Sequence, residues 1–191
     1  MNSFYSQEEL SEIGLKSYGI NVLLSRKVSI YGAPNISLGS NVRIDDFCIL
    51  SGKITIGNYV HIASYAALYG ANSGITMEDF STLSSRVVVY GISDDYSGVS
   101  MTNPMIPKEY KPGMIEEEVF IRKHVVVGAG SVLLPGIILE EGCCVGAMSL
   151  CTRSTEPWSV NAGIPARKLN DRKKDLLILE EKFIRDISSG K

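Results

Sequence analysis

Few side chains in this sequence could take a proton from a nucleophile at neutral pH. The chain has two histidines, His61 and His124, and a pair of adjacent carboxylates, Asp94 and Asp95, in the stretch VVVYGISDDYSG at residues 87–98. A histidine acts as a general base near its ordinary pKa, whereas a carboxylate does so only when burial or a neighbouring charge raises its pKa. We therefore take His61, Asp94 and Asp95 as the catalytic candidates.

A metal site is not expected. Two histidines cannot supply a three-histidine zinc site, and the four cysteines show no C-x-x-C spacing. We expect the cysteines to be small buried side chains. His124 stands at a turn just before a strand, where polar residues are common, and we expect it to be structural.

The elements that must position these residues follow a six-residue period. In each hexad, a short strand directs residues one and three to one face and residue two to the other, and Gly, Asn, Asp or Ser at residues four to six allow a bend. The third residues are Leu38, Ile44, Leu50, Ile56, Ile62, Leu68, Met77, Leu83, Val89, Ile121, Val127, Leu133, Leu139, Val145 and Cys151. This many hexads in phase predict an all-β parallel solenoid with an aliphatic core. His61 is the second residue of its hexad and is expected to point outward.

Both ends of such a solenoid need covers, because an open end invites further strands to pair with it. Ser6 and Glu9 form a capping-box pattern, which predicts a short helix near the N-terminus. Leu176, Leu179, Phe183 and Ile187 share one face of a predicted C-terminal helix, which we expect to pack on the last coil or on a neighbouring subunit. The expected parts are a cap at 1–27, a hexapeptide-repeat domain at 28–169 with an inserted loop at 93–116, and a C-terminal helix at 170–191.

The hexads, together with the motifs GISDDYSG, TNPMIP, GAMSL and EPWSVNAGIPARKL, resemble those of the hexapeptide-repeat acyltransferases. Within that family the chain is most similar to bacterial sugar O-acetyltransferases of surface-polysaccharide synthesis. The resemblance implies a left-handed, triangular parallel β-helix and a homotrimer with active sites between adjacent subunits. It also implies that the inserted loop shapes the acceptor pocket, and we take Ser93, Tyr96 and Asn103 as candidates for substrate binding.

The resemblance further implies that acetyl-CoA is the acyl donor. Matching positions assign the small residues Gly128, Ala129 and Ala147 to the pantetheine channel, and the segment with Gly163 and Pro165 to its closure. The basic residues Arg167 and Lys168 match positions that hold the phosphates, and Thr152 and Arg153 match a second position that contacts the nucleotide end. Arg and Lys suit phosphate by charge, and Arg also by bidentate geometry.

The chain departs from the sugar acetyltransferases at one position. Those enzymes use a histidine just after the strand that ends here at residues 89–91, where this chain has Ser93, Asp94 and Asp95. Our main expectation is transfer of an acetyl group to a sugar hydroxyl in O-antigen or other surface-polysaccharide synthesis, with His61 or an aspartate as base. The alternative acceptor is the amine of a nucleotide-linked amino sugar, for which a strong base is less necessary because a deprotonated amine is itself nucleophilic. A catalytically inactive β-helix scaffold is the third hypothesis.

Composition excludes other classes. The net charge of −2 provides no general attraction to nucleic acid. No apolar run approaches the roughly 20 residues that span a bilayer. The N-terminal stretch lacks the basic and apolar regions of a signal peptide. We therefore expect no nucleic-acid partner, no integral membrane segment and a cytoplasmic location.

Overall fold

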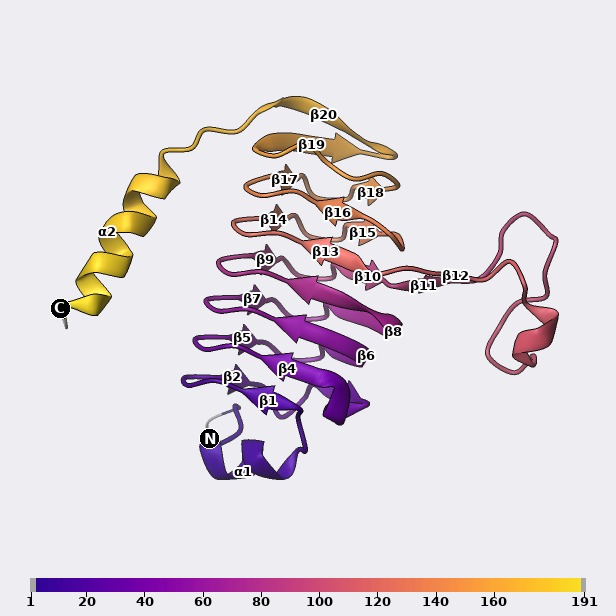
Figure 1. Ribbon diagram of the computed structural model, residues 1–191, viewed down its shortest axis with the longest axis horizontal. Coiled ribbons are helices and arrows are strands. Elements are labelled where there is room, and N and C mark those ends of the chain that lie inside the picture. Colours follow the sequence, from indigo (N-terminus) through magenta and orange to yellow (C-terminus); the bar gives the residue numbers. More distant parts are fainter. Residues whose placement is uncertain (1–2, 190–191) are drawn as a thin grey trace.

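A computed structural model describes residues 3–189, which form a parallel β-solenoid of about seven turns (Figure 1). The predicted solenoid is confirmed. Residues 1, 2, 190 and 191, at the ends of the expected cap and C-terminal helix, lie outside the described part. The helical elements are α1 (Gln7–Glu12), η1 (Ala33–Asn35), η2 (Lys108–Tyr110) and α2 (Leu176–Ser188).

The walls of the solenoid belong to a ten-stranded and an eight-stranded sheet. The first contains β1 (Ser17–Tyr18), β3 (Ser29–Tyr31), β4 (Ile36–Leu38), β6 (Ile49–Ile56), β8 (Ala67–Met77), β10 (Val88–Tyr90), β13 (Val119–Ile121), β15 (Val132–Leu133), β16 (Ile138–Leu139) and β18 (Leu150–Cys151). The second contains β2 (Leu23–Leu24), β5 (Arg43–Ile44), β7 (His61–Ile62), β9 (Thr82–Leu83), β14 (Val126–Val127), β17 (Cys144–Val145), β19 (Ser159–Gly163) and β20 (Ala166–Asp171). A separate pair, β11 (Ile92–Ser93) and β12 (Ile115–Glu116), is antiparallel.

The core is a set of columns made by the third residues of the hexads. Ile44 pairs in register with Ile62, and Ile62 with Leu83, so inward side chains of successive coils lie above one another. These three side chains are fully buried. Because apolar burial drives folding and each coil buries its face only against its neighbours, the six-residue pattern also specifies the register.

Residues in the left-handed conformation, most of them large, line two of the corners. The helix-side corner contains Tyr59, Phe80, His124, Gly142 and Trp158, and the open corner contains Phe47, Tyr65, Arg86, Gly130 and Met148; all ten have positive φ. Few non-glycine residues adopt this region. The backbone repeats it because each of these amides bonds to the coil before, as Tyr65 N does to Asp46 O at 3.1 Å. The turn-forming types expected at hexad residues four to six therefore share the corners with aromatic and other large residues at these positions.

The third corner, the loop corner, carries Gly52, Ala71 and the start of the inserted loop. β11 and β12 form a stem that carries this loop away from the solenoid (Figure 1). The loop therefore adds little to the core.

The covers differ from expectation at both ends. α1 begins with the predicted capping box at Ser6 and Glu9, and Leu10 of this helix is fully buried. β1 and β2 already pair with β4 and β5, so the first coil starts at Ser17, inside the segment expected as cap. At the other end, β20 folds back antiparallel on β19 and covers the last coil. The edge is thus protected by a hairpin and not by the helix.

Helix α2 runs back along the solenoid and docks on the helix-side corner (Figure 1). The Phe183 ring meets the Tyr59 ring edge-on, with centroids 5.3 Å apart, and also contacts Phe80. Glu180 forms ion pairs with Lys123 and with His124. The helix therefore packs on the middle coils and not on the last one. No helix within residues 3–189 is long and apolar enough to cross a membrane.

Replacing Phe183 by Ala should undock α2 while leaving the solenoid folded. Each aromatic contact contributes about 0.5–1.5 kcal/mol, so the undocked population should rise roughly tenfold. Hydrogen exchange of the α2 amides measures this change. Ile178→Ala, at a mostly exposed position of the same helix, is the matched control. Equal protection of α2 in the two variants would show that Phe183 does not hold the helix.

Candidate active site

The small residues predicted for the pantetheine channel form one strip on the open corner. Met148 N donates to Ala129 O at 2.8 Å, which stacks the coils that carry Ala129 and Ala147. A Cβ on Gly128 would overlap the backbone nitrogen of Ala147, so coil stacking itself requires glycine there. Gly163 N donates to Ser149 Oγ at 3.0 Å, which places the Gly163–Pro165 turn at the same edge.

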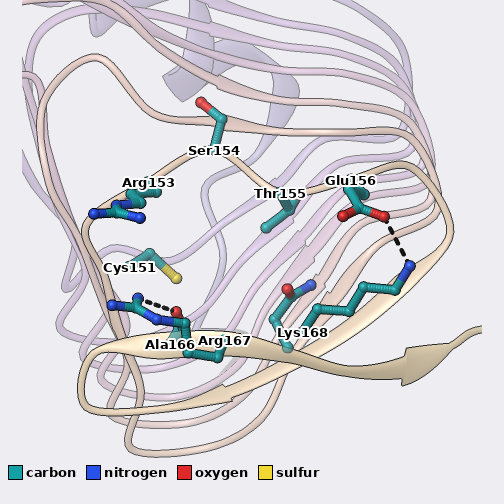
Figure 2. A pocket seen from close by; sticks show the side chains of 9 residues that line it. Cys151, Arg153, Ser154, Thr155, Glu156, Ala166, Arg167 and Lys168 are labelled. Carbon is teal, nitrogen blue, oxygen red and sulfur yellow. Dashed lines mark hydrogen bonds and ion pairs between the residues drawn. The ribbon is translucent and has the colours of Figure 1, made fainter.

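The predicted basic residues gather in a second place, a pocket of about 160 Å³ beside the β19–β20 hairpin (Figure 2). Arg153 and Arg167 line it, and neither forms an ion pair with a carboxylate of residues 3–189. Lys168 reaches across to Glu156 at 2.7 Å and also pairs with Asp171 at 2.8 Å. Hydrogen bonds to Asp171 and Glu156 raise the pKa of Lys168. The two arginines are thus available to a phosphate group, whereas Lys168 is already engaged.

The donor residues do not all share one surface of a single chain. Gly128 follows β14 at the open corner, while Thr152 and Arg153 follow β18, which continues the stack of β10 and β15 toward the loop corner. One wall of the solenoid separates these two groups.

His61 points outward from β7, as predicted, and its side chain is 42% exposed. Its Nε2 lies 2.8 Å from Asp45 Oδ2, and Asp45 Oδ1 accepts from Arg43 Nε at 2.7 Å. Burial raises the pKa of Asp45, but hydrogen bonds from His61 and Arg43 outweigh it and hold that pKa below its ordinary value. A carboxylate in this position fixes the orientation of the imidazole ring.

Ser84 is a candidate that the sequence analysis did not select. It follows β9 at the open corner, and its backbone N donates to Val127 O at 2.9 Å, one residue before Gly128. Ser84 Oγ makes no hydrogen bond within residues 3–189, and the residue is half-buried. One serine among several at hexad corners carries no signal in the sequence, because only the stacking of coils places it beside the pantetheine strip.

The inserted loop is organised by its two aspartates. The Asp95 carboxylate accepts five hydrogen bonds, from the Ser97 hydroxyl and from the amides of Ser97, Gly98, Val99 and Ser100. The Ser97 hydroxyl and then these amides lower the pKa of Asp95 to about 2. The raised pKa that a carboxylate base requires is therefore not found at Asp95, because its lone pairs hold the turn.

Asp94, in contrast, keeps most of its hydrogen-bonding capacity. Asp94 is half-buried, and its Oδ2 accepts one hydrogen bond, from Asn103 N at 3.1 Å. Ser93 Oγ donates to the Asp94 carbonyl at 3.0 Å, while Tyr96 is 95% exposed. Of the two carboxylates, Asp94 is the one with oxygens left to contact a ligand.

His124 has a structural environment. Its side chain is 7% exposed, its ring stacks on Phe80 with centroids 5.3 Å apart, and its Nε2 lies 2.8 Å from Glu180 Oε2. Within residues 3–189, no three His, Cys, Asp or Glu side chains are grouped to hold a metal ion. Burial raises the pKa of Cys48, Cys143 and Cys151 to about 11, so these thiols stay protonated.

A search against protein-family models found no match. A dTDP-4-amino-4,6-dideoxy-D-glucose acyltransferase of Escherichia coli is 45% identical over 184 residues, which are 95% of this chain and 95% of that protein. The chain belongs to the hexapeptide-repeat acyltransferases. It is an acyltransferase by this relationship.

Solved structures of AntD, an N-acyltransferase from Bacillus cereus, are similar over nearly the whole chain. The complex of AntD with dTDP and 3-hydroxybutyryl-CoA is 50% identical, with a TM-score of 0.96, and covers 98% of this chain and 100% of that chain. The S84A variant of AntD is solved with dTDP-4-amino-4,6-dideoxyglucose and coenzyme A, and the D94A variant with dTDP and coenzyme A; both are 50% identical with a TM-score of 0.95 and cover 97% of this chain and 100% of that chain.

Replacing Asp95 by Asn should disorder the turn at residues 97–100. Because the pKa of Asp95 lies below its ordinary value of 3.8, its carboxylate stabilises the turn above that pH and loses this effect as the pH falls through about 2. The neutral amide of the variant should reproduce the acid state at pH 7. NMR shifts and exchange of the Gly98, Val99 and Ser100 amides report it. Asp94→Asn, which affects one backbone hydrogen bond, is the control; equal perturbation by both variants would contradict this role.

Proposed function

We propose that this protein transfers an acyl group from an acyl-CoA to the amine of a dTDP-linked 4-amino-4,6-dideoxy sugar. The observation that carries the proposal is Asp94, a half-buried carboxylate where the hydroxyl-acylating relatives use a histidine. The name of the Escherichia coli relative and the ligands of AntD support the same acceptor class. The amino-sugar alternative therefore replaces the sugar hydroxyl as the favoured acceptor.

The chemistry fits an acidic site. An amino sugar arrives as an ammonium ion, and the Asp94 carboxylate attracts and orients it. The ammonium first loses one proton to solvent. The amine then attacks the thioester carbonyl, a C–N bond forms and the C–S bond breaks, and a second proton passes from the nitrogen to the departing sulfur, so that coenzyme A leaves as a thiol. Because a neutral amine is itself a good nucleophile, a histidine base is not required.

Ser84 is suited to stabilise the reacting carbonyl. The residue is half-buried, its hydroxyl has no hydrogen-bond partner within the described residues, and it lies beside the pantetheine strip at Gly128. A hydroxyl in this position donates to the oxygen that becomes negative in the tetrahedral intermediate. AntD variants at residues 84 and 94 were solved, and this chain has serine and aspartate at the same numbers, which supports roles for both residues.

The donor is an acyl-CoA, and the arginines of the hairpin pocket are suited to its phosphates. Arg153 and Arg167 lie toward the same end of the pocket, away from the ion pair between Lys168 and Glu156 (Figure 2). AntD is solved with 3-hydroxybutyryl-CoA, which supports transfer of short acyl groups beyond acetyl by this protein.

A homotrimer completes this site. Asp94 and Arg153 belong to the loop corner, whereas Ser84 and Gly128 belong to the open corner of the same chain. Packing three copies with the loop corner of one against the open corner of the next brings the two sets together. The loop that would span this junction exposes large apolar side chains, Tyr96, Val99 and Met105 among them.

Sedimentation velocity should therefore give a single species of three chains. Deleting the loop tip at residues 96–111 should weaken the trimer, because it removes the apolar side chains that have no cover in one chain. A monomer at micromolar concentration for the intact chain would contradict the shared site.

The identity of the acceptor group can be tested by measuring the rate at which coenzyme A thiol is released from acetyl-CoA. The two acceptors compared are dTDP-linked 6-deoxy sugars that carry either an amine or a hydroxyl at C4. We expect turnover at least about 100-fold faster with the amine, near-normal turnover for His61→Ala, and a fall of about 10²-fold or more in kcat for Asp94→Asn. Turnover confined to the hydroxyl, with loss of activity in His61→Ala, would restore the hydroxyl hypothesis. Failure to bind any acyl-CoA would favour the scaffold.

A further inference from the structure

The open corner carries an exposed ladder of aromatic rings on its N-terminal half. The rings of Phe47 and Tyr65 stack with centroids 4.9 Å apart and an interplanar angle of 23°. Lys27 Nζ lies 5.1 Å from the Phe47 centroid, and the Arg86 guanidinium lies 5.9 Å from the Tyr65 centroid. Phe47 is 46% exposed and Tyr65 53% exposed. Flat apolar surface is thus presented to solvent between two cations.

The second corner with stacked aromatic rings, in contrast, is covered by a helix. On the helix-side corner, Tyr59 and Phe80 also stack at 4.9 Å, but Phe183 of α2 covers both rings. Within residues 3–189 no segment covers the Phe47–Tyr65 pair in the same way. Aromatic rings stabilise a protein mainly when their faces are buried. Exposed rings gain that stabilisation only when a ligand or partner covers them, so such rings are often binding sites.

The two cations of the ladder are not equivalent. Lys27 forms an ion pair with Asp46 at 2.9 Å. Arg86 forms none with any carboxylate of the described chain, so its guanidinium is an uncompensated positive charge at the end of the ladder nearer Ser84. A guanidinium binds phosphate oxygens in a bidentate manner.

The order of groups along the corner matches a nucleotide sugar. Arg86 follows Ser84 by two residues in the same coil, Tyr65 lies one coil further toward the N-terminus, and Phe47 one beyond that. Coils are about 4.8 Å apart, the spacing of paired strands. The acyl-donor strip begins on the opposite side of Ser84, at Gly128. An acceptor whose amine reaches Ser84 therefore places its diphosphate at Arg86 and its base along the rings.

We propose that Arg86, Tyr65 and Phe47 form the subsite for the nucleoside diphosphate of the acceptor. Arg86 binds the diphosphate, and the Tyr65 and Phe47 rings stack on the pyrimidine base. The inference rests on the proposed function, because it assigns the nucleotide half of that acceptor. The donor enters from the C-terminal half of the open corner and the acceptor from the N-terminal half.

Isothermal titration of dTDP into the full-length protein tests this subsite. Tyr65→Ala should raise the Kd for dTDP about 10-fold or more, through loss of base stacking. Arg86→Gln should raise the Kd for dTDP by a similar factor and leave thymidine binding unchanged, because thymidine has no phosphate. Coenzyme A should bind all variants with the wild-type Kd, which also shows that they are folded.

Matched controls separate the subsite from general surface effects. Tyr31→Ala removes an exposed tyrosine that forms no ring stack in the described chain, and Arg185→Gln removes an exposed arginine on α2. Both should bind dTDP like the wild type. If Tyr65→Ala fails to fold, Tyr65→Leu keeps the apolar volume and removes the ring.

The outcomes distinguish the two proposals. Wild-type dTDP affinity in both Tyr65→Ala and Arg86→Gln would overturn the subsite and leave the proposed function in place. If Tyr65→Ala also dissociates the trimer in sedimentation velocity, the rings are a contact with the neighbouring copy instead. A wild-type protein that binds coenzyme A but neither binds dTDP nor acylates a dTDP-linked amino sugar would overturn the proposed function itself.

Discussion

In-register stacking of one coil on the next is the constraint on which this molecule depends. Each coil buries its aliphatic residues only against its neighbours, so an error of one residue would turn core side chains outward. The same stacking creates columns on the outside. Residues of like position in successive coils, such as Asp45, Ala63, Ser84 and Gly128, lie above one another although many residues separate them in the chain.

The three corners use this regularity for different purposes. The helix-side corner stacks Tyr59, Phe80 and His124 and covers them with α2, which is a structural use. The inserted loop, which carries Asp94, begins at the loop corner. On the open corner no segment of residues 3–189 covers the stacked rings of Phe47 and Tyr65, and the corner continues into the strip of small residues at Gly128, Ala129 and Ala147. The contacts that stabilise the fold therefore lie on a different corner from the residues that are candidates for ligand binding.

Charge is also distributed unevenly over these surfaces. Two lysines near the candidate site are paired with carboxylates, Lys168 with Glu156 and Lys27 with Asp46. Arg86, Arg153 and Arg167 have no such partner in the described chain. An acyl-CoA and a nucleotide sugar both carry phosphates, which guanidinium groups without a carboxylate partner are suited to bind.

By itself, the sequence determined the solenoid, its core columns, the N-terminal capping box and the outward direction of His61, because these follow from local periodicity and from side-chain types at neighbouring positions. It also set aside His124 as structural. It did not distinguish Asp95 from Asp94, because the two are adjacent residues of the same type. In the structure the Asp95 carboxylate accepts five hydrogen bonds that hold a turn, whereas the Asp94 carboxylate accepts one. Only the tertiary structure placed Ser84 beside Gly128, docked α2 on the middle coils and left Phe47 and Tyr65 without a covering segment among residues 3–189. Those contacts join residues from different coils, and no local pattern records which side chains meet when coils stack or which corner a distant helix will cover.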